Sequence, residues 1–96
     1  MAIQIVKTGV NIATSATSAG ATLPTNSSGA VAQYVRIVST AAAYVRMGTG
    51  AQTAVNTDML INPGVGEIFA TNGNTHIAAL QVAAAGIVQV SPVEGV

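Results

Sequence analysis

The sequence contains no cysteine, so disulfide frameworks and thiolate metal sites are excluded. It has no tryptophan and only three aromatic residues, so its core must be mainly aliphatic. The longest candidate for an apolar run, "IAALQVAAAGIVQV" at 77–90, is interrupted by Gln81, Gly86 and Gln89. We therefore expect no membrane span and no membrane partner. The opening stretch, "MAIQIVKTGVNIATS", lacks a basic region followed by a long apolar one, so a secretory signal is not expected either.

Charge is also scarce, at 6% of residues, whereas soluble domains contain about 25%. Three basic residues balance three acidic ones, which leaves no basic surface for nucleic acid. A net charge of zero gives little repulsion between copies. The sequence thus favours a subunit of an assembly, a homo-oligomer for which a trimer is one arrangement. The alternative is a monomer coated with Ser, Thr and Asn.

What the chain does contain favours strands. Val, Ile and Thr make up 32 of its 96 residues, and these side chains suit a pleated, half-buried surface. The length predicts one domain, residues 1–96. Seven or eight short alternating stretches separated by turn signals predict an all-β fold, a β-sandwich or jelly-roll-like arrangement of antiparallel strands. Because 18 of the 48 apolar residues are Ala, the core is thin, and neighbouring subunits are expected to bury part of the surface.

The amino-terminal third divides into two short strands and a low-complexity segment. "AIQIVK" and "GVNIAT" alternate apolar and polar residues, whereas 13–30 is rich in Ser, Thr, Gly and Ala. Such a segment is either a flexible loop or an intersubunit arm that becomes ordered on a neighbour. Leu23 is its one large apolar side chain, and Pro24 favours an extended chain there. We expect Leu23 to dock in an apolar pocket of the adjacent subunit.

The tripeptide Tyr-Val-Arg occurs twice within "YVRIVSTAAAYVRMGTG", residues 34–50. The stretch predicts a hairpin whose core-facing residues are Val35, Ile37, Val45 and Met47. The outward-facing residues, which are the other candidate interface residues, are Tyr34, Arg36, Tyr44 and Arg46. A register that sets each arginine beside a tyrosine avoids opposing two like charges. These side chains either shield apolar neighbours or form a contact surface, since Tyr and Arg are enriched at interface hot spots.

The carboxy-terminal third contains the clearest turn signal, Asn72-Gly73, which suits a type I′ hairpin. This hairpin pairs Phe69 with His76 and Ile68 with Ile77. The following "IAALQVAAA" is expected to be a strand, with a short helix as the alternative because Ala is the best helix former. "IVQVSP" is expected to be the last strand and to end at Pro92, since proline cannot donate to a sheet ladder.

Catalytic chemistry has little support. The single histidine, His76, shares a face of the predicted hairpin with Glu67, which allows either an acid/base pair or an ordinary packed side chain. No nucleophile elbow occurs, and the "GTG" and "GVG" stretches lack the context of a phosphate loop. We therefore expect no enzyme activity, no catalytic residues, no metal site and no cofactor.

Residues 34–96 resemble a family of small virion proteins of tailed bacteriophages. The resemblance rests on "YVRIVSTAAAYVRMGTG", "TDMLINPGVGEIF", "THIAALQV" and "GIVQVSPVE". It implies a structural component of the virion, made in the host bacterial cytoplasm, whose partners are the major capsid protein or other virion proteins. Low charge and abundant Ala, Thr and Gly suit a subunit held by many neighbours, so within this resemblance we first expect a head decoration or cement protein that bridges capsid subunits noncovalently. The alternative is a neck, tail or fibre component with a receptor- or carbohydrate-binding role, in which exposed tyrosines stack on sugars.

Overall fold

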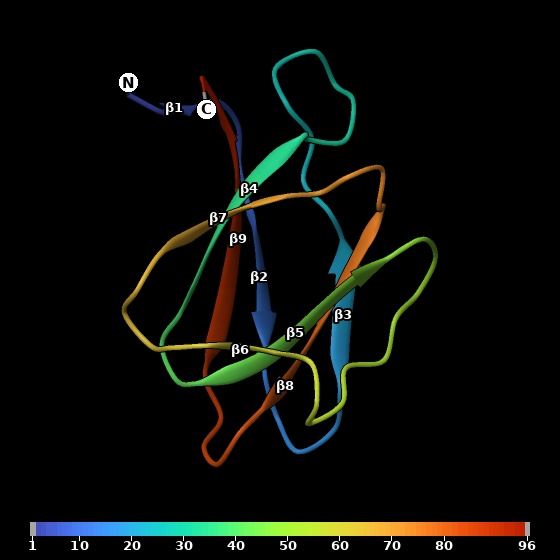
Figure 1. Ribbon diagram of the computed structural model, residues 1–96, viewed down its shortest axis with the longest axis vertical. Helices are drawn as coiled ribbons and strands as arrows, with labels where there is room; N and C mark the ends of the chain where they lie inside the picture. Colours follow the sequence, from blue (N-terminus) through green and yellow to red (C-terminus); the bar gives the residue numbers. More distant parts are fainter. Residues whose placement is uncertain (1, 96) are drawn as a thin grey trace.

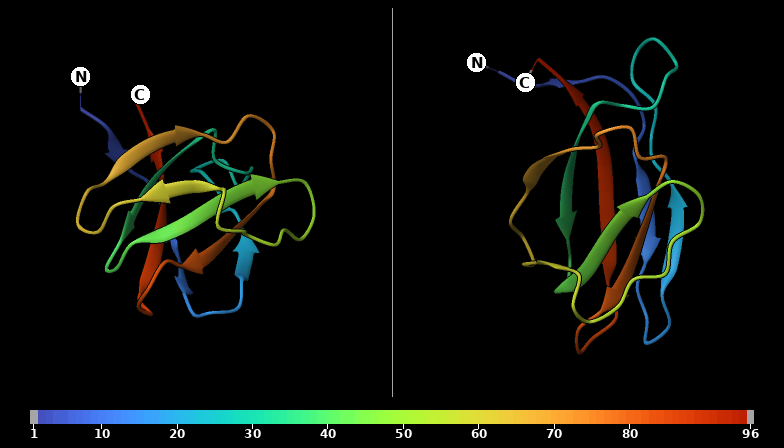
Figure 2. Two further views of the ribbon diagram at one scale, coloured as in Figure 1. Left: turned by 60° about the horizontal axis from the view of Figure 1, so that its bottom comes forward. Right: turned by 45° about the vertical axis from the view of Figure 1, so that its right-hand side comes forward.

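The computed structural model describes residues 2–95, which form nine strands in two sheets packed face to face (Figures 1 and 2). No helix forms within these residues. The strands are β1 (Gln4–Ile5), β2 (Val10–Ala13), β3 (Ala19–Thr22), β4 (Tyr34–Ser39), β5 (Ala43–Gly48), β6 (Met59–Ile61), β7 (Glu67–Ala70), β8 (His76–Gln81) and β9 (Ile87–Glu94). All the strand pairings are antiparallel. The prediction of an all-β sandwich is confirmed, with nine strands where seven or eight were expected.

Sheet A has the strand order β1-β9-β4-β7, and β2 pairs with the first half of β9 on the same side as β1. Sheet B has the order β3-β8-β5-β6. Strands β7 and β6 are therefore outer strands, one in each sheet, and both lie toward the viewer in Figure 1. Neither pairs with the other, so the two sheets are not joined by hydrogen bonds between these strands.

The core lies between the sheets and is built from the alternate residues that face inward. In β4, Val35 and Ile37 are fully buried, whereas their neighbours Tyr34 and Arg36 are half-buried on the outer face. Strands β8 and β9 supply further buried residues, which include Ile77, Ala79, Val88 and Val90. Burying each Val or Ile stabilises the fold by about 1.5–3 kcal/mol, so the alternation predicted from sequence determines which face of each strand points inward.

The predicted hairpin between the two Tyr-Val-Arg strands is wrong. Strand β4 pairs with β9 and β7 in sheet A, and β5 pairs with β8 and β6 in sheet B. The short connection at 40–42 carries the chain across the sandwich instead of turning it back within one sheet. The inward and outward parities were correct, since Val35, Ile37 and Val45 are buried and Met47 packs against the core. Alternation specifies a face but not a partner strand.

The Asn72-Gly73 turn is present, but it does not close a hairpin. Both residues have positive φ angles, 52° and 82°, and the Asn74 amide donates to the Thr71 carbonyl over 2.9 Å, as a type I′ turn requires. The flanking strands nevertheless belong to different sheets, because β7 pairs with β4 and β8 pairs with β3 and β5. The predicted pairing of Phe69 with His76 is therefore wrong, and so is that of Ile68 with Ile77.

The last two strands differ from the prediction in detail. Residues 76–81 form strand β8, so the helical alternative for this stretch is wrong. Strand β9 continues through Pro92 to Glu94, although the sequence predicted an end at the proline. Pro92 lies opposite the break between β1 and β2, because β2 pairs with β9 only up to Val90 and β1 pairs from Val93. A missing amide donor is tolerated at such a break.

The low-complexity segment 13–30 is not an arm. Residues Ala19–Thr22 form the edge strand β3 of sheet B, paired with β8. Leu23 is only 4% exposed, belongs to the core cluster of its own chain and donates its amide to the Thr75 carbonyl over 2.8 Å. The prediction that Leu23 docks in a neighbouring subunit is therefore wrong. Small residues suit this strand because the Gly20 position closely approaches the Ile77 carbonyl of β8.

Candidate interaction surfaces

The outer face of sheet B is partly covered by the chain's own 49–58 loop. The Arg46 Nε atom lies 3.1 Å from Asp58 Oδ2 and 3.2 Å from Oδ1, and Oδ2 also accepts a hydrogen bond from the Val55 amide over 2.8 Å. The Ala54 amide donates to Ser18 Oγ over 2.8 Å, and Ala54 itself is buried. The loop is therefore held at its middle by Ala54 and at its end by Asp58, and Arg46 contributes to the second contact.

The outer face of sheet A has no comparable cover. Its central residue, Arg36, lies beside Ser91 of β9 and Ile68 of β7, and its guanidinium packs over Gly66, where a Cβ atom would collide with it. A hollow of about 390 Å³ opens on this face. We call it the basic hollow, and it is lined by Ile3, Ile5, Lys7, Arg36, Gln89, Ser91, Pro92 and Val93. Two cations beside exposed aliphatic side chains suit a partner that is both apolar and acidic.

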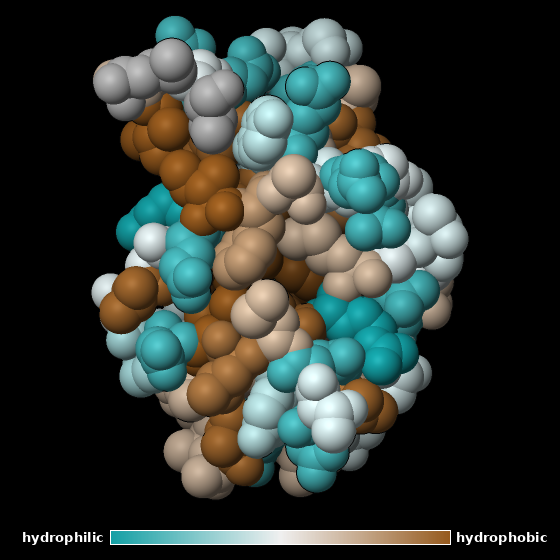
Figure 3. Space-filling view, in the orientation of Figure 1, coloured by the Kyte–Doolittle hydropathy of each residue, from teal (hydrophilic) through white to brown (hydrophobic). Residues whose placement is uncertain are grey.

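A second apolar surface lies where the sandwich is open between its sheets. We call this hollow of about 240 Å³ the seam, and it is lined by Ile37, Val45, Arg46, Met47, Met59, Phe69, Ala70 and Asn74. The space-filling view shows an apolar depression in the middle of the molecule, between β7 and the β5–β6 pair (Figure 3). Further exposed aliphatic side chains, Leu60, Val65 and Ile68, belong to β6, β7 and their connection. The seam exists because β7 and β6 do not pair.

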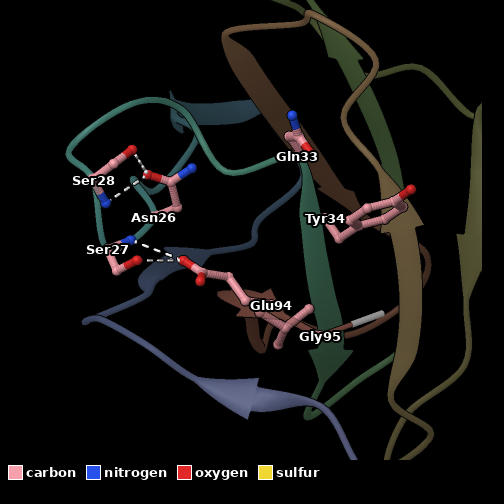
Figure 4. Close-up of a pocket in the computed structure, with 8 residues that line it drawn as sticks. Asn26, Ser27, Ser28, Gln33, Tyr34, Glu94 and Gly95 are labelled. Carbon is pink, nitrogen blue, oxygen red and sulfur yellow. Dashed lines mark hydrogen bonds between the residues drawn. The ribbon is translucent and has the colours of Figure 1, made fainter. Parts of the chain in front are cut away.

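A polar hollow of about 380 Å³ lies beside the 26–31 loop and the end of β9 (Figure 4). The carboxylate oxygen Oε2 of Glu94 accepts hydrogen bonds from the Ser27 amide over 3.0 Å and from the Ser27 hydroxyl over 2.8 Å. These bonds favour the ionised form, so the amide first and the hydroxyl second lower the pKa of the Glu94 carboxyl below its ordinary value. Figure 4 shows Glu94 directed at Ser27, so this carboxylate fixes the loop.

The predicted juxtaposition of Glu67 and His76 does not occur. Glu67 pairs across from Ile37 in sheet A, and His76 pairs across from Thr22 and Gly48 in sheet B. The His76 Nδ1 atom lies 2.7 Å from the Thr75 hydroxyl. Among residues 2–95, no three His, Asp, Glu or Cys side chains gather closely enough to hold a metal ion. No helix in this part of the chain is long and apolar enough to cross a membrane.

The structure separates the five candidate interface residues predicted from sequence. Tyr34 and Arg36 lie on the outer face of sheet A, and Tyr44 and Arg46 lie on the outer face of sheet B, so the four do not form one surface. Leu23 is in the core. Sequence reasoning missed Ile5, Lys7 and the seam. The sequence predicted a strand in this segment, but it did not show that the side chains of Ile3 and Ile5 are exposed to solvent.

Comparison with protein-family models, curated proteins and solved structures found no match to this chain.

Proposed function

We propose that this chain is a structural protein of a tailed bacteriophage particle, a head decoration protein that bridges capsid subunits noncovalently. The observation that carries the proposal is the composition of its surface. Among residues 2–95, ten large apolar side chains are exposed, whereas the sequence has only six charged residues. A surface of this kind is typical of a protein that is covered by neighbours. The resemblance of residues 34–96 to phage virion proteins is the reason for proposing that the assembly is a phage particle.

The proposed mechanism uses sheet edges and apolar burial. The edge strands β6 and β7 offer unpaired backbone groups, and the seam beside them offers an apolar hollow. Docking by the 13–30 segment is not part of the mechanism, because Leu23 lies in the core of its own chain. The fibre alternative gains no support from the tyrosines, since Tyr34 and Tyr44 lie on opposite outer faces and form no shared platform for a sugar.

The test is the copy number of the chain in purified particles of the phage that encodes it. Quantitative mass spectrometry with the major capsid protein as internal standard is expected to find hundreds of copies per particle. A few dozen copies would contradict decoration and favour a neck, tail or fibre position. Absence from the particle would overturn the whole proposal. Capsids that lack the protein are expected to lose their DNA at a lower temperature than complete particles do.

A further inference from the structure

The segment 2–7, which contains the two-residue strand β1, presents apolar side chains to solvent. Ile5 is 92% exposed although it pairs with Val93 of β9, and Ile3 is 38% exposed. Ile3 and Ile5 flank Gln4 in and beside β1, and together with Lys7, which lies at a bend just after the strand, they line the basic hollow. Strand β1 lies at one end of the molecule, beside the end of β9 (Figures 1 and 2). An isoleucine as exposed as Ile5 forgoes the stabilisation that burial of its side chain would provide.

The seam offers an apolar surface that suits such side chains. It is a hollow with an apolar lining into which Met59 (59% exposed) and Phe69 project, and the core residues Ile37 and Val45 form part of its wall. Side chains that line such a hollow lack partner atoms on one side. An aliphatic side chain from outside would supply those contacts.

The charges of Lys7 and Glu67 determine which surfaces of two copies can contact each other. Within residues 2–95 the one ion pair joins Arg46 to Asp58, and Glu94 is hydrogen-bonded by Ser27. Lys7 beside the protruding isoleucine therefore has no ionic partner in the described part of its own chain, and neither does Glu67. Glu67 lies two residues before Phe69 on the same side of β7, next to the seam.

Two copies that met through the same surface would oppose Lys7 to Lys7 or Glu67 to Glu67. Contact between unlike surfaces instead brings Lys7 to Glu67 while Ile5 enters the seam. Opposite charges across an interface favour encounter and fix the orientation, whereas like charges oppose it.

We propose that copies of this chain associate head to tail, with the segment 2–7 of one copy packed against the seam of the next. Such an interface is heterologous, so it closes into a ring where the rotation between copies allows and otherwise extends as a filament. The inference deepens the proposed function, because it names the contact by which copies would join into an assembly. The contact can be tested without virions, because it involves only copies of this chain.

The test is sedimentation equilibrium of the isolated chain over a range of protein and salt concentrations. The wild-type chain is expected to self-associate at micromolar concentration. Ile5→Ser and Met59→Ser each remove one half of the contact and are expected to raise the dissociation constant at least about tenfold. Val82→Ser is the matched control, because Val82 is also exposed, at 42%, but lies in the β8–β9 connection at the opposite end of the molecule (Figure 1).

Mixing the two variants distinguishes unlike from like surfaces. The Ile5→Ser chain keeps an intact seam and the Met59→Ser chain keeps an intact segment 2–7, so their mixture is expected to form one-to-one dimers that do not grow further. Lys7→Glu and Glu67→Lys are each expected to weaken association, and the double reversal to restore it.

Three results would overturn the inference. These are a wild-type chain that stays monomeric, association that Ile5→Ser leaves unchanged, and a mixture that fails to dimerise. Each is measured without virions and therefore leaves the copy-number test of the proposed function standing. Conversely, the chain could self-associate by this contact and yet be absent from phage particles. That result would overturn the proposed function and leave the inference standing.

Discussion

The same tripeptide, Tyr-Val-Arg, lies at the centre of both sheets, and its two copies have different surroundings. In sheet B, Arg46 holds Asp58, and the 49–58 loop covers part of the outer face. In sheet A, Arg36 packs over Gly66 and faces an open hollow. The middle valines behave alike, since Val35 and Val45 are both buried. Local sequence therefore determines the inward side of each strand, whereas distant segments determine whether the outer side is covered.

The largest expected effect concerns the segment that sequence reasoning assigned to a neighbour. Leu23→Ala is expected to lower the free energy of unfolding by about 2–5 kcal/mol, because it leaves a cavity in the chain's own core beside β3. Urea denaturation of the isolated chain measures this. Val82→Ala, at an exposed position, is expected to change stability by no more than about 0.5 kcal/mol. Unchanged unfolding of the Leu23 variant, with loss of association, would restore the intersubunit arm.

The two arginines give a smaller effect that bears directly on the comparison. Arg46→Ala is expected to lower the free energy of unfolding by about 0.2–1 kcal/mol, the usual range for a partly exposed ion pair. Arg36→Ala is expected to weaken association with little effect on the free energy of unfolding, because Arg36 shares the basic hollow with Ile5 and Lys7. Equal effects of the two substitutions on the free energy of unfolding would remove the distinction between the faces.

The smallest effect concerns the loop at the end of sheet A. Because hydrogen bonds from Ser27 lower the pKa of Glu94, the contribution of this contact is present above the unfolded pKa and is lost as the pH falls through the folded value. The Ser27 amide resonance is expected to titrate with a midpoint below the ordinary glutamate value of 4.5. Ser27→Ala removes the hydroxyl donor and is expected to raise the midpoint measured on Glu94. A midpoint at 4.5 in both chains would show that the contact is absent in solution.

Sequence reasoning succeeded where the physics is local. The alternation of Val35 and Ile37 with Tyr34 and Arg36 predicted the buried face, and Asn72-Gly73 predicted a turn with two positive φ angles. It failed where partners are distant along the chain. The Asn72-Gly73 turn was predicted correctly, but this turn and the connection at 40–42 both join strands of different sheets, so both predicted strand pairings were wrong.

The interaction surfaces were hidden from sequence for the same reason. The seam combines Phe69 of β7 with Met59 of β6, and their proximity depends on how the two sheets stack. Leu23 had the signature of an anchor, a large apolar residue among small ones, but that signature does not say whether the pocket belongs to its own chain or to another. Sheet stacking places it in its own core.

The central claim is that the segment 2–7 of one copy packs against the seam of the next, and zero-length carbodiimide cross-linking of the isolated chain tests it most directly. Lys7 is the only lysine, and Asp58, Glu67 and Glu94 are the only side-chain carboxylates, so each product is identifiable by mass spectrometry. Mixing unlabelled with ¹⁵N-labelled chain separates links between copies from links within one. The account predicts a Lys7–Glu67 link between copies that Ile5→Ser abolishes. A Lys7 link to Glu94 or Asp58 alone, or no link between copies at all, would contradict it.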